Sequence, residues 1–460
     1  MLRKEDKTGW IFAVDPATPF SRGRHPLLEY SLIPYVRMKI VTAEEAIGLI
    51  PPDGVIGLGN ACGEPQTLIE ALIGACTRFK GAQLIGMIQF SSQHIWKTDR
   101  GTHFTWKTFM MDPFLVEAAR EGKADYIPCR YSEIPLLFSE KILPLDVALV
   151  SVSPPSPDGR MSLGVSVDHT FAMAKAAKMV IGEINQQMPW VEGETFLYPS
   201  QIHYAIQTDR SLPQVNTETL TEADRKIGNY IASLIPDGAT IQFGIGKISH
   251  SFLASLRGKK HLGIHSGLLV DEIVDLVESG AIDNSLKVLH RGKIIGTTMI
   301  GTDRLYRFVD RNPDVESYPS SYTHNAAILA QLNHFYSING ALQVDLSGQV
   351  NAETVSGVQV SGIGGQSDFV QGARLSRGGK SIIALSSTTP EEKTSRIVAH
   401  LERDAAVSSL RHDVDYVVTE YGIASLQGKS LGERARALVE ISHPSFRETL
   451  EAESLKIFSK

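Results

Sequence analysis

The feature that most constrains the fold is a stretch of sequence that occurs twice. The first copy reads Pro52-Asp-Gly-Val-Ile-Gly-Leu-Gly and the second reads Pro236-Asp-Gly-Ala-Thr-Ile-Gln-Phe-Gly-Ile-Gly. A helix-like stretch precedes each copy (residues 43–50 and 224–234), and apolar residues at helical spacing follow each glycine loop. Strand, glycine loop and helix in this order form the unit of a parallel sheet. The duplication predicts two similar open parallel-sheet α/β domains; the alternative is two unrelated domains that share a common turn.

The domain boundary is expected in the polar stretch at residues 212–221. We therefore predict an N-terminal domain over residues 39–216 and a C-terminal domain over residues 217–460. Residues 1–38 mix Pro, Gly, aromatic and charged residues without a clear period, which indicates an irregular extension lying on the main body. A flexible tail and a natural start at Met38 are the alternatives for this stretch.

Bulk composition narrows the function classes. A chain of 460 residues is too long for one ordinary core, and 42% hydrophobic with 21% charged residues is typical of a globular protein. A net charge of −6 gives no basic footprint for nucleic acid. Three cysteines without a CxxC pair fit a reducing compartment, and no signal peptide or membrane-spanning apolar run is present in the sequence. We expect a cytoplasmic protein with neither a nucleic-acid nor a membrane partner.

Neither copy of the glycine loop is a dinucleotide fingerprint. Gly57 and Gly59 in the first copy, and Gly244 and Gly246 in the second, lack the third glycine at the required spacing. The loops are either tight turns between strand and helix or places where the backbone approaches a phosphate or a pantetheine arm.

A second glycine cluster, Gly362-Ile-Gly-Gly-Gln-Ser-Asp-Phe, is denser. Glycines at 362, 364 and 365 cost backbone entropy on folding, so a functional reason is expected, although a plain tight turn is the alternative. Such turns can present backbone N–H groups to a developing oxyanion. The fourteen histidines show no HExxH or other metal-ligand spacing, so no metal is predicted, and no Gly-x-Ser-x-Gly elbow appears.

Five ordered runs of the chain resemble one protein family, the acetyl-CoA hydrolase/CoA-transferase family, which includes 4-hydroxybutyrate and succinate:acetate CoA-transferases. The resemblance spans about residues 40–450 and is most specific at residues 146–168, 301–313, 344–354, 361–369 and 415–424. It implies two α/β domains with the active site between them. It also implies acyl-CoA and a small carboxylic acid as partners, CoA as the only carrier with no further cofactor, and a possible homodimer.

The resemblance assigns roles to particular residues. In that family a glutamate attacks the thioester and holds CoA as a glutamyl thioester, while an asparagine side chain and a glycine N–H form the oxyanion hole. The asparagine falls on Asn325 and the glycine on Gly365. The glutamate falls on Gly267, in Gly263-Ile-His-Ser-Gly, and glycine has no side chain to form an anhydride or thioester. Gln371 and Gln427 also stand where arginine is expected.

Three mechanisms remain open from the sequence. In the first, water attacks the thioester, a nearby base (His265, Glu353 or Glu272) activates it, and Asn325 with Gly365 stabilises the oxyanion. His265 has a competing interpretation as a packed strand residue. In the second, another carboxylate, Glu353 in the first instance, carries a CoA-transferase reaction. In the third, the protein binds acyl-CoA without catalysis.

Overall fold

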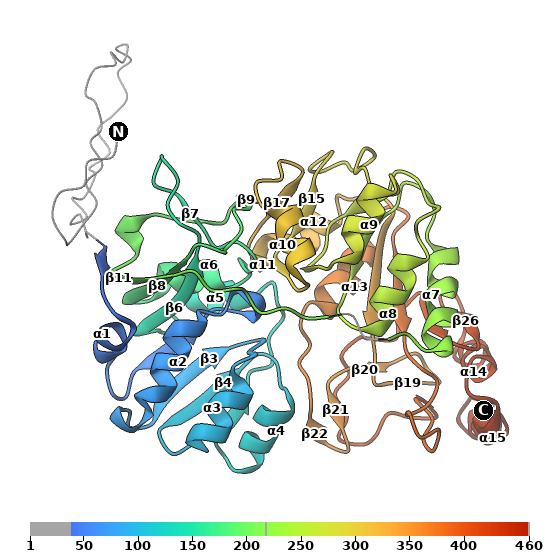
Figure 1. Ribbon diagram of the computed structural model, residues 1–460. Coiled ribbons are helices and arrows are strands. Elements are labelled where there is room, and N and C mark those ends of the chain that lie inside the picture. Colours follow the sequence, from blue (N-terminus) through green and yellow to red (C-terminus); the bar gives the residue numbers. More distant parts are fainter. Residues whose placement is uncertain (1–37, 217–218, 459–460) are drawn as a thin grey trace, which may run out of the picture.

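The computed structural model describes residues 38–216 and 219–458 of the chain; the predicted extension at residues 1–38 therefore lies outside the described residues except for Met38. Two α/β bodies lie side by side, the N-terminal one in blue to green and the C-terminal one in yellow-green to red (Figure 1). The linking segment runs from the end of the first body at Thr208 to the helix that begins at Glu222. The predicted boundary at residue 216 falls in this segment and stays a prediction.

The N-terminal body contains an eight-stranded sheet in which every neighbouring pair is parallel. Its strands, in spatial order, are β1 (Lys39–Ile40), β11 (Tyr204–Thr208), β8 (Met179–Asn185), β6 (Val147–Val152), β2 (Val55–Leu58), β3 (Ala82–Gly86), β4 (Phe104–Thr108) and β5 (Ala124–Tyr126).

Helices cover both faces of this sheet. Strand β6 shows why: alternate side chains of a strand point to opposite faces, and all of its residues are buried. Val147 and Leu149 pack with α1 (Ala43–Gly48), α2 (Gln66–Gly74), α3 (Ser92–Asp99) and α4 (Pro113–Arg120), whereas Val150 packs with α5 (Ile134–Ser139) and α6 (Thr170–Ala176).

The C-terminal body repeats this plan with a smaller sheet. Its strands are, in order, β13 (Gly263–Ile264), β12 (Thr240–Phe243), β18 (Phe335–Gly340), β23 (Lys380–Ala384), β25 (Tyr416–Thr419) and β26 (Gly422–Ser425), and only β26 is antiparallel. Its helices are α7 (Glu222–Leu234), α8 (Lys247–Ala254), α9 (Glu272–Glu278), α10 (Asp303–Val309), α11 (Ser320–Thr323), α12 (Ala326–Leu329), α13 (Gln366–Leu375), α14 (Leu431–Glu440) and α15 (Pro444–Phe458). The mixed α/β class with two mostly parallel sheets is the predicted fold class.

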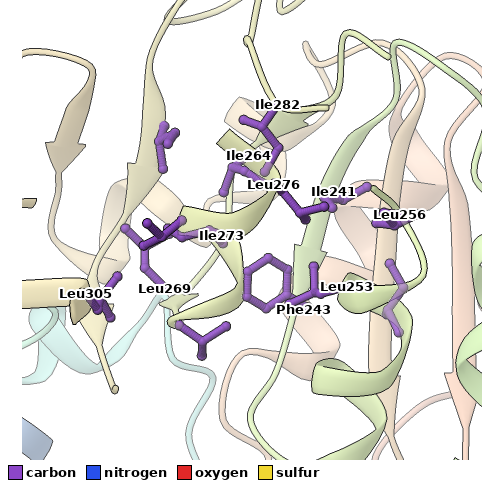
Figure 2. Close-up of a cluster of buried hydrophobic side chains, with 14 of the residues drawn as sticks. Ile241, Phe243, Leu253, Leu256, Ile264, Leu269, Ile273, Leu276, Ile282 and Leu305 are labelled. Atoms are coloured by element: carbon purple, nitrogen blue, oxygen red, sulfur yellow. The ribbon is translucent and has the colours of Figure 1, made fainter. Parts of the chain in front are cut away.

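The second copy of the duplicated sequence forms the start of this core. Ile241 and Phe243 on β12 pack in one cluster with Leu253 of α8 and Ile273 of α9 (Figure 2). The first copy is built in the same way, with Thr42 as the helix cap of α1 and β2 following the Pro-Asp-Gly turn. The two strand–loop–helix units predicted from the repeat are thus confirmed.

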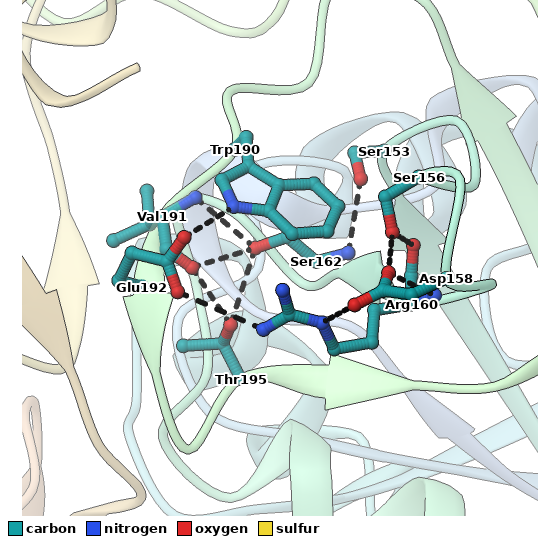
Figure 3. A network of polar contacts seen from close by, with 9 residues as sticks. All are labelled: Ser153, Ser156, Asp158, Arg160, Ser162, Trp190, Val191, Glu192 and Thr195. Carbon is teal, nitrogen blue, oxygen red and sulfur yellow. Dashed lines mark hydrogen bonds and ion pairs between the residues drawn. The ribbon is translucent and has the colours of Figure 1, made fainter. Parts of the chain in front are cut away.

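Short strands tie the two bodies together. Strand β9 (Glu192–Gly193) of the N-terminal half pairs with β17 (Val315–Ser317), which in turn pairs with β15 (Ile294–Gly296). The proline-led loop at residues 153–160 contacts this segment through Arg160, whose guanidinium lies 3.8 Å from the Glu192 carboxylate, and the Ser162 hydroxyl after the loop contacts Val191 and Thr195 (Figure 3). This places the loop against the segment that crosses between the domains.

Other short strands lie outside the two main sheets. They are β7 (Met161–Ser162), β10 (Phe196–Leu197), β14 (Leu268–Leu269), β16 (Thr298–Met299), β19 (Gln343–Asp345), β20 (Val350–Asn351), β21 (Thr354–Val355), β22 (Val358–Gln359) and β24 (Ile397–Val398). Residues 38–216 and 219–458 also contain three 3₁₀ turns: η1 (Ala61–Gly63), η2 (Cys76–Arg78) and η3 (Pro199–Gln201). Within the described parts of the chain, no helix combines the length and the apolar character that crossing a bilayer requires.

Candidate active site

The two bodies contact each other where the segment after β5 meets the glycine turn before α13. The Tyr131 N–H donates to the Gly364 carbonyl at 3.2 Å, and the Tyr126 hydroxyl accepts from the Ile363 N–H at 3.1 Å. Ser132 donates through its N–H and its hydroxyl to the Asp368 carboxylate. The glycine turn at residues 362–365 is therefore fixed from the N-terminal side as well as by its own helix.

Gly267 lies in this junction, between β13 and β14. Its carbonyl accepts from the Thr298 N–H at 3.2 Å, and the residue is buried. A Cβ placed on Gly267 would lie 2.6 Å from His324 Nε2, 2.8 Å from His324 Cε1 and 3.3 Å from a ring carbon of Phe369. The atoms nearest to the position of the missing side chain therefore belong to two rings, with no carboxylate among them.

Gly365 faces the same end of the imidazole. A Cβ placed on Gly365 would lie 2.4 Å from His324 Cδ2 and 2.6 Å from His324 Nε2. Two of the predicted site residues, Gly267 and Gly365, are thus brought together with His324 between them. Phe369 and Tyr131 hold the imidazole, with ring centroids at 4.4 and 4.6 Å.

His324 is buried, and burial lowers the pKa of its imidazole to about 3. Its Nδ1 lies 2.8 Å from the Thr323 hydroxyl. Among residues 38–216 and 219–458, no hydrogen-bond partner of Nε2 is found. A neutral imidazole therefore presents one nitrogen to the space between the two glycines.

Gly365 occupies the N-cap position of α13. In the described part of the chain no acceptor for its N–H is found. The first turn of a helix carries partial positive charge from unpaired N–H groups, so this N–H can donate to an anionic oxygen. The sequence prediction of a donor platform at this turn is compatible with that geometry.

Asn325 does not join this group. It is exposed and caps α12, accepting from the Ala327 N–H at 2.9 Å, while its amide nitrogen lies 3.4 Å from the Ser321 carbonyl oxygen. The side chain facing Gly365 is that of the preceding residue, His324.

Two predicted bases have other partners. Glu353 accepts from the Tyr126 hydroxyl at 3.1 Å and from the Ser408 hydroxyl at 2.7 Å, and it also receives a bond from Gln359. Glu272 pairs with His250 Nδ1 on α8. Each carboxylate is therefore held by its own hydrogen-bond partners, and neither is among the atoms nearest to a Cβ on Gly267.

His265 lies behind the site, fully buried. Its Nε2 lies 3.0 Å from the Thr323 carbonyl oxygen, to which it donates as N–H, and in the described residues its Nδ1 has no partner. Burial holds its pKa well below the ordinary value. This residue supports the backbone next to His324.

The two glycine loops differ in the space around them. A Cβ on Gly57 would lie 2.4 Å from Met173 Sδ, and one on Gly59 would lie 2.9 Å from the Gly63 carbonyl oxygen. These two glycines are needed for close packing. At Gly244 and Gly246 a Cβ would meet nothing within 4 Å.

The second loop borders a cavity of about 180 Å³ at the seam between the domains. Its wall includes Phe90 from the N-terminal body, Asn216 from the linking segment, and Gly244, Gly246 and Ser249 from the C-terminal body. A ligand approaching the backbone has room at the second loop and little at the first.

Gly362 and Gly364 serve the junction. A Cβ on Gly362 would lie 2.4 Å from the Phe109 carbonyl oxygen of the other body, so only glycine permits that approach. Gly364 has φ +52°, a left-handed conformation that glycine adopts readily.

A buried carboxylate, Asp168, connects the bodies next to the site. It accepts from Asn60 Nδ2 at 2.9 Å and from the Thr298 hydroxyl at 3.0 Å, and from Ser166 and Thr170. Burial alone would raise its pKa, but the His169 imidazole and these hydrogen bonds hold the pKa below the ordinary value. Asp168 is thus an anchored carboxylate with its lone pairs in use.

The chain matches the acetyl-CoA hydrolase/transferase N-terminal domain over residues 31–215 and the corresponding C-terminal domain over residues 301–454. The protein belongs to the acetyl-CoA hydrolase/transferase family. It is therefore an acyl-CoA-processing enzyme. Its family contains both hydrolases and CoA-transferases.

Particular family members are similar over most of their length. A 4-hydroxybutyrate coenzyme A transferase from Clostridium kluyveri is 44% identical over 91% of this chain and 98% of that protein. RipA from Yersinia pestis has a TM-score of 0.85 and 31% identity over 91% of this chain and 97% of RipA. A 4-hydroxybutyrate CoA-transferase from Porphyromonas gingivalis has a TM-score of 0.77 and 34% identity over 91% and 98%.

Gln371 and Gln427, where arginine is expected in the family, each accept a hydrogen bond from a cation. Arg130 of the N-terminal body donates to Gln371 at 2.9 Å, and Lys380 donates to Gln427 at 2.6 Å. Arg130 and Lys380 therefore supply positive charge beside positions 371 and 427, where arginine is expected.

One group of described residues has the composition of metal ligands. Ligand atoms of Cys76, Asp99 and His103 lie within 4.8 Å of one another in the N-terminal body. Asp99 already accepts from the His103 and Phe104 N–H groups and contacts His103 Nδ1 at 2.6 Å. These bonds account for the grouping as a loop-stabilising cluster, and we assign no metal to it.

Proposed function

We propose that this family member hydrolyses acyl-CoA thioesters by direct attack of water, without a covalent glutamyl–CoA intermediate. The observation that carries the proposal is the bare backbone at Gly267. The space that a side chain there would enter is bordered by the rings of His324 and Phe369. Without a carboxylate at that position, we take water as the nucleophile.

The proposed chemistry uses electrostatic stabilisation as its main source of acceleration. The Gly365 N–H, at the start of α13, donates to the oxyanion that forms when water adds to the carbonyl carbon. His265, Glu353 and Glu272, the predicted bases, are held by other partners, so we propose no dedicated general base. An oxyanion hole with binding alone gives roughly 10³–10⁴-fold acceleration over water in a serine protease. A modest hydrolase is expected on that scale.

Acyl-CoA is proposed to bind along the seam between the bodies. The open backbone at Gly244 and Gly246 and the adjoining cavity offer room for a pantetheine or phosphate group. CoA enters as part of the substrate, so no separate cofactor is required. A cytoplasmic location and a homodimer belong to the same proposal.

A CoA-transferase is the second candidate, and the relatives favour it. The Clostridium protein, 44% identical over nearly its full length, is a CoA transferase by name. Transfer here would need another carboxylate, and Glu353 is the first candidate from the sequence. Its carboxylate would have to leave Tyr126 and Ser408 to reach a thioester.

The test measures free thiol and acyl-CoA products together. Purified protein is incubated with acetyl-, propionyl- and larger acyl-CoAs, with and without acetate or succinate. Hydrolysis predicts thiol release that is independent of the added acid and no new acyl-CoA. Formation of acetyl-CoA or succinyl-CoA from another acyl-CoA would replace the hydrolase with a transferase, and tight CoA binding without either product would indicate a non-catalytic binder.

A further inference from the structure

The imidazole of His324 stands where the site needs a donor. Its Nε2 is 2.6 Å from the position of a Cβ on Gly365 and 2.6 Å from that of a Cβ on Gly267. The ring is buried and clamped between Phe369 and Tyr131, so its place is determined by packing from both bodies. Asn325, the residue expected to donate, points to the exposed side of α12.

We assign the proton of the neutral imidazole from the contacts of Thr323. The Thr323 hydroxyl lies 2.8 Å from His324 Nδ1 and 3.4 Å from the Pro319 carbonyl oxygen. The Pro319 carbonyl oxygen already accepts from the Tyr322 and Thr323 N–H groups at 2.9 and 3.1 Å, so we assign the hydroxyl proton to the shorter contact, with Nδ1 as its acceptor. Nδ1 therefore accepts, and in the neutral ring the proton is on Nε2, which faces the glycines.

We propose that His324 Nε2–H and the Gly365 N–H together form the oxyanion hole of this protein. The inference rests on the proposed function, because it assigns the donors for the same thioester cleavage. Water adds to the carbonyl carbon, and the oxygen that gains the electron pair accepts from both N–H groups. When the carbonyl re-forms, the carbon–sulfur bond breaks, and the CoA thiolate takes the proton that the water has lost. The products are a carboxylic acid and the CoA thiol.

A donor role fits the environment better than a base role. Burial, opposed in part by the charge of Asp168, keeps the imidazole neutral at physiological pH. An efficient general base has a pKa near the working pH, whereas a neutral imidazole can donate to an oxyanion at any pH above its own pKa. Around the ring the described groups are Tyr131 and Asp168 from the N-terminal body, and His265 and Phe369 from the C-terminal body.

The same geometry explains why the glutamate is absent. A side chain at residue 267 would begin 2.6 Å from Nε2, which is closer than a Cβ can approach. Phe369 and Tyr131 block the ring from moving aside. A glutamate at position 267 and a histidine at position 324 therefore exclude each other.

The first experiment separates a donor from a base. Asparagine can donate a hydrogen bond but cannot act as a base near neutral pH. His324→Asn is expected to keep hydrolysis within about tenfold of the parent, whereas His324→Ala loses about 10²–10³-fold, the usual cost of one oxyanion donor. Both variants should bind CoA and show parental circular dichroism. Equal loss in the two variants, with fold and CoA binding intact, would overturn the donor assignment.

The second experiment works even if the parent hydrolyses nothing. In the pair Gly267→Glu/His324→Asn and Gly267→Glu/His324→Ala, the removal of the imidazole leaves room for the glutamate. The variant with asparagine is expected to transfer CoA to acetate at least about 100-fold faster than the variant with alanine, because only asparagine supplies the donor. Gly267→Glu alone should stay at background. Equal transfer by both double variants would refute the role of position 324, and an inactive parent beside an active pair would refute only the proposed hydrolysis.

Discussion

Gly267 and His324 constrain each other at the scale of single residues. The glycine leaves the space that the imidazole fills, and the imidazole takes the position beside Gly365 that the sequence assigned to Asn325. A change at either residue therefore affects the other, because a close-packed interior has little room to adjust.

Gly267→Ala tests this packing. The added methyl group would lie 2.6 Å from His324 Nε2, so we expect a loss of about 1–3 kcal/mol in the free energy of unfolding, as for overpacked cores. Urea denaturation gives the value. Gly74→Ala is the matched control, since a Cβ there meets nothing within 4 Å and the residue ends α2; it should be neutral or slightly stabilising. Equal stability of the two variants would contradict the packing described.

The buried imidazole also predicts a pH dependence. The His324 pKa is about 3 in the folded protein and near 6.5 in an unfolded chain, so the unfolded chain binds the extra proton between these values. Stability is therefore lost as the pH falls below 6.5. Between pH 7 and pH 5 we expect the parent to lose on the order of 2 kcal/mol more than His324→Asn, measured by urea denaturation at both pH values. Parallel losses would mean that the ring is not buried as neutral imidazole.

At the scale of elements, the glycine turn before α13 takes its position from the opposite body. The Tyr126 hydroxyl at the end of β5 links the Glu353 carboxylate to the Ile363 N–H. The site therefore depends on a side chain more than 200 residues away in sequence.

Tyr126→Phe removes this link and keeps the ring. Hydrolysis should fall by about tenfold or more, because a small displacement of the Gly365 donor weakens oxyanion stabilisation, and the free energy of unfolding should fall by about 1–3 kcal/mol. Steady-state thiol release and urea denaturation provide the two readouts. Tyr336→Phe is the control, since Tyr336 is buried and no described residue is hydrogen-bonded to its hydroxyl. If Tyr126→Phe behaves like the control, the position of the glycine turn does not matter for the proposed hydrolysis.

These elements also show which parts of the structure can be predicted from the sequence. Thr42 as helix cap, the strands at β2 and β12 and the parallel class follow from local patterns, since caps and apolar periodicity are local physics. The partners of Gly365 cannot be predicted from local patterns, because a sequence motif does not show which of two adjacent side chains, His324 or Asn325, points inward. That choice depends on Tyr131 and Phe369, which approach from distant parts of the chain.

At the scale of the whole molecule, the two bodies share polar groups that neither can satisfy alone. Asp168 from the N-terminal body accepts from Thr298, whose own N–H donates to Gly267. Strand β9 completes a sheet with β17 of the other body. We therefore expect the bodies to unfold together.

Asp168→Ala tests this coupling. It leaves the Asn60 and Thr298 donors buried without their acceptor, which should cost about 3 kcal/mol or more. Tryptophan fluorescence and far-ultraviolet circular dichroism should report one shared, lowered midpoint in urea. Asp158→Ala, an exposed carboxylate in the 153–160 loop, should change stability by less than about 1 kcal/mol. Separate transitions for the two probes would show that the bodies unfold independently.

The most direct measurement of the central claim is the intact-protein mass during turnover of an acyl-CoA, with borohydride added to trap any enzyme thioester. Because Gly267 offers no side chain for a covalent bond, the account predicts an unmodified mass while free CoA accumulates. A mass increase corresponding to bound CoA, or a reduced glutamate located by peptide mapping, would contradict it.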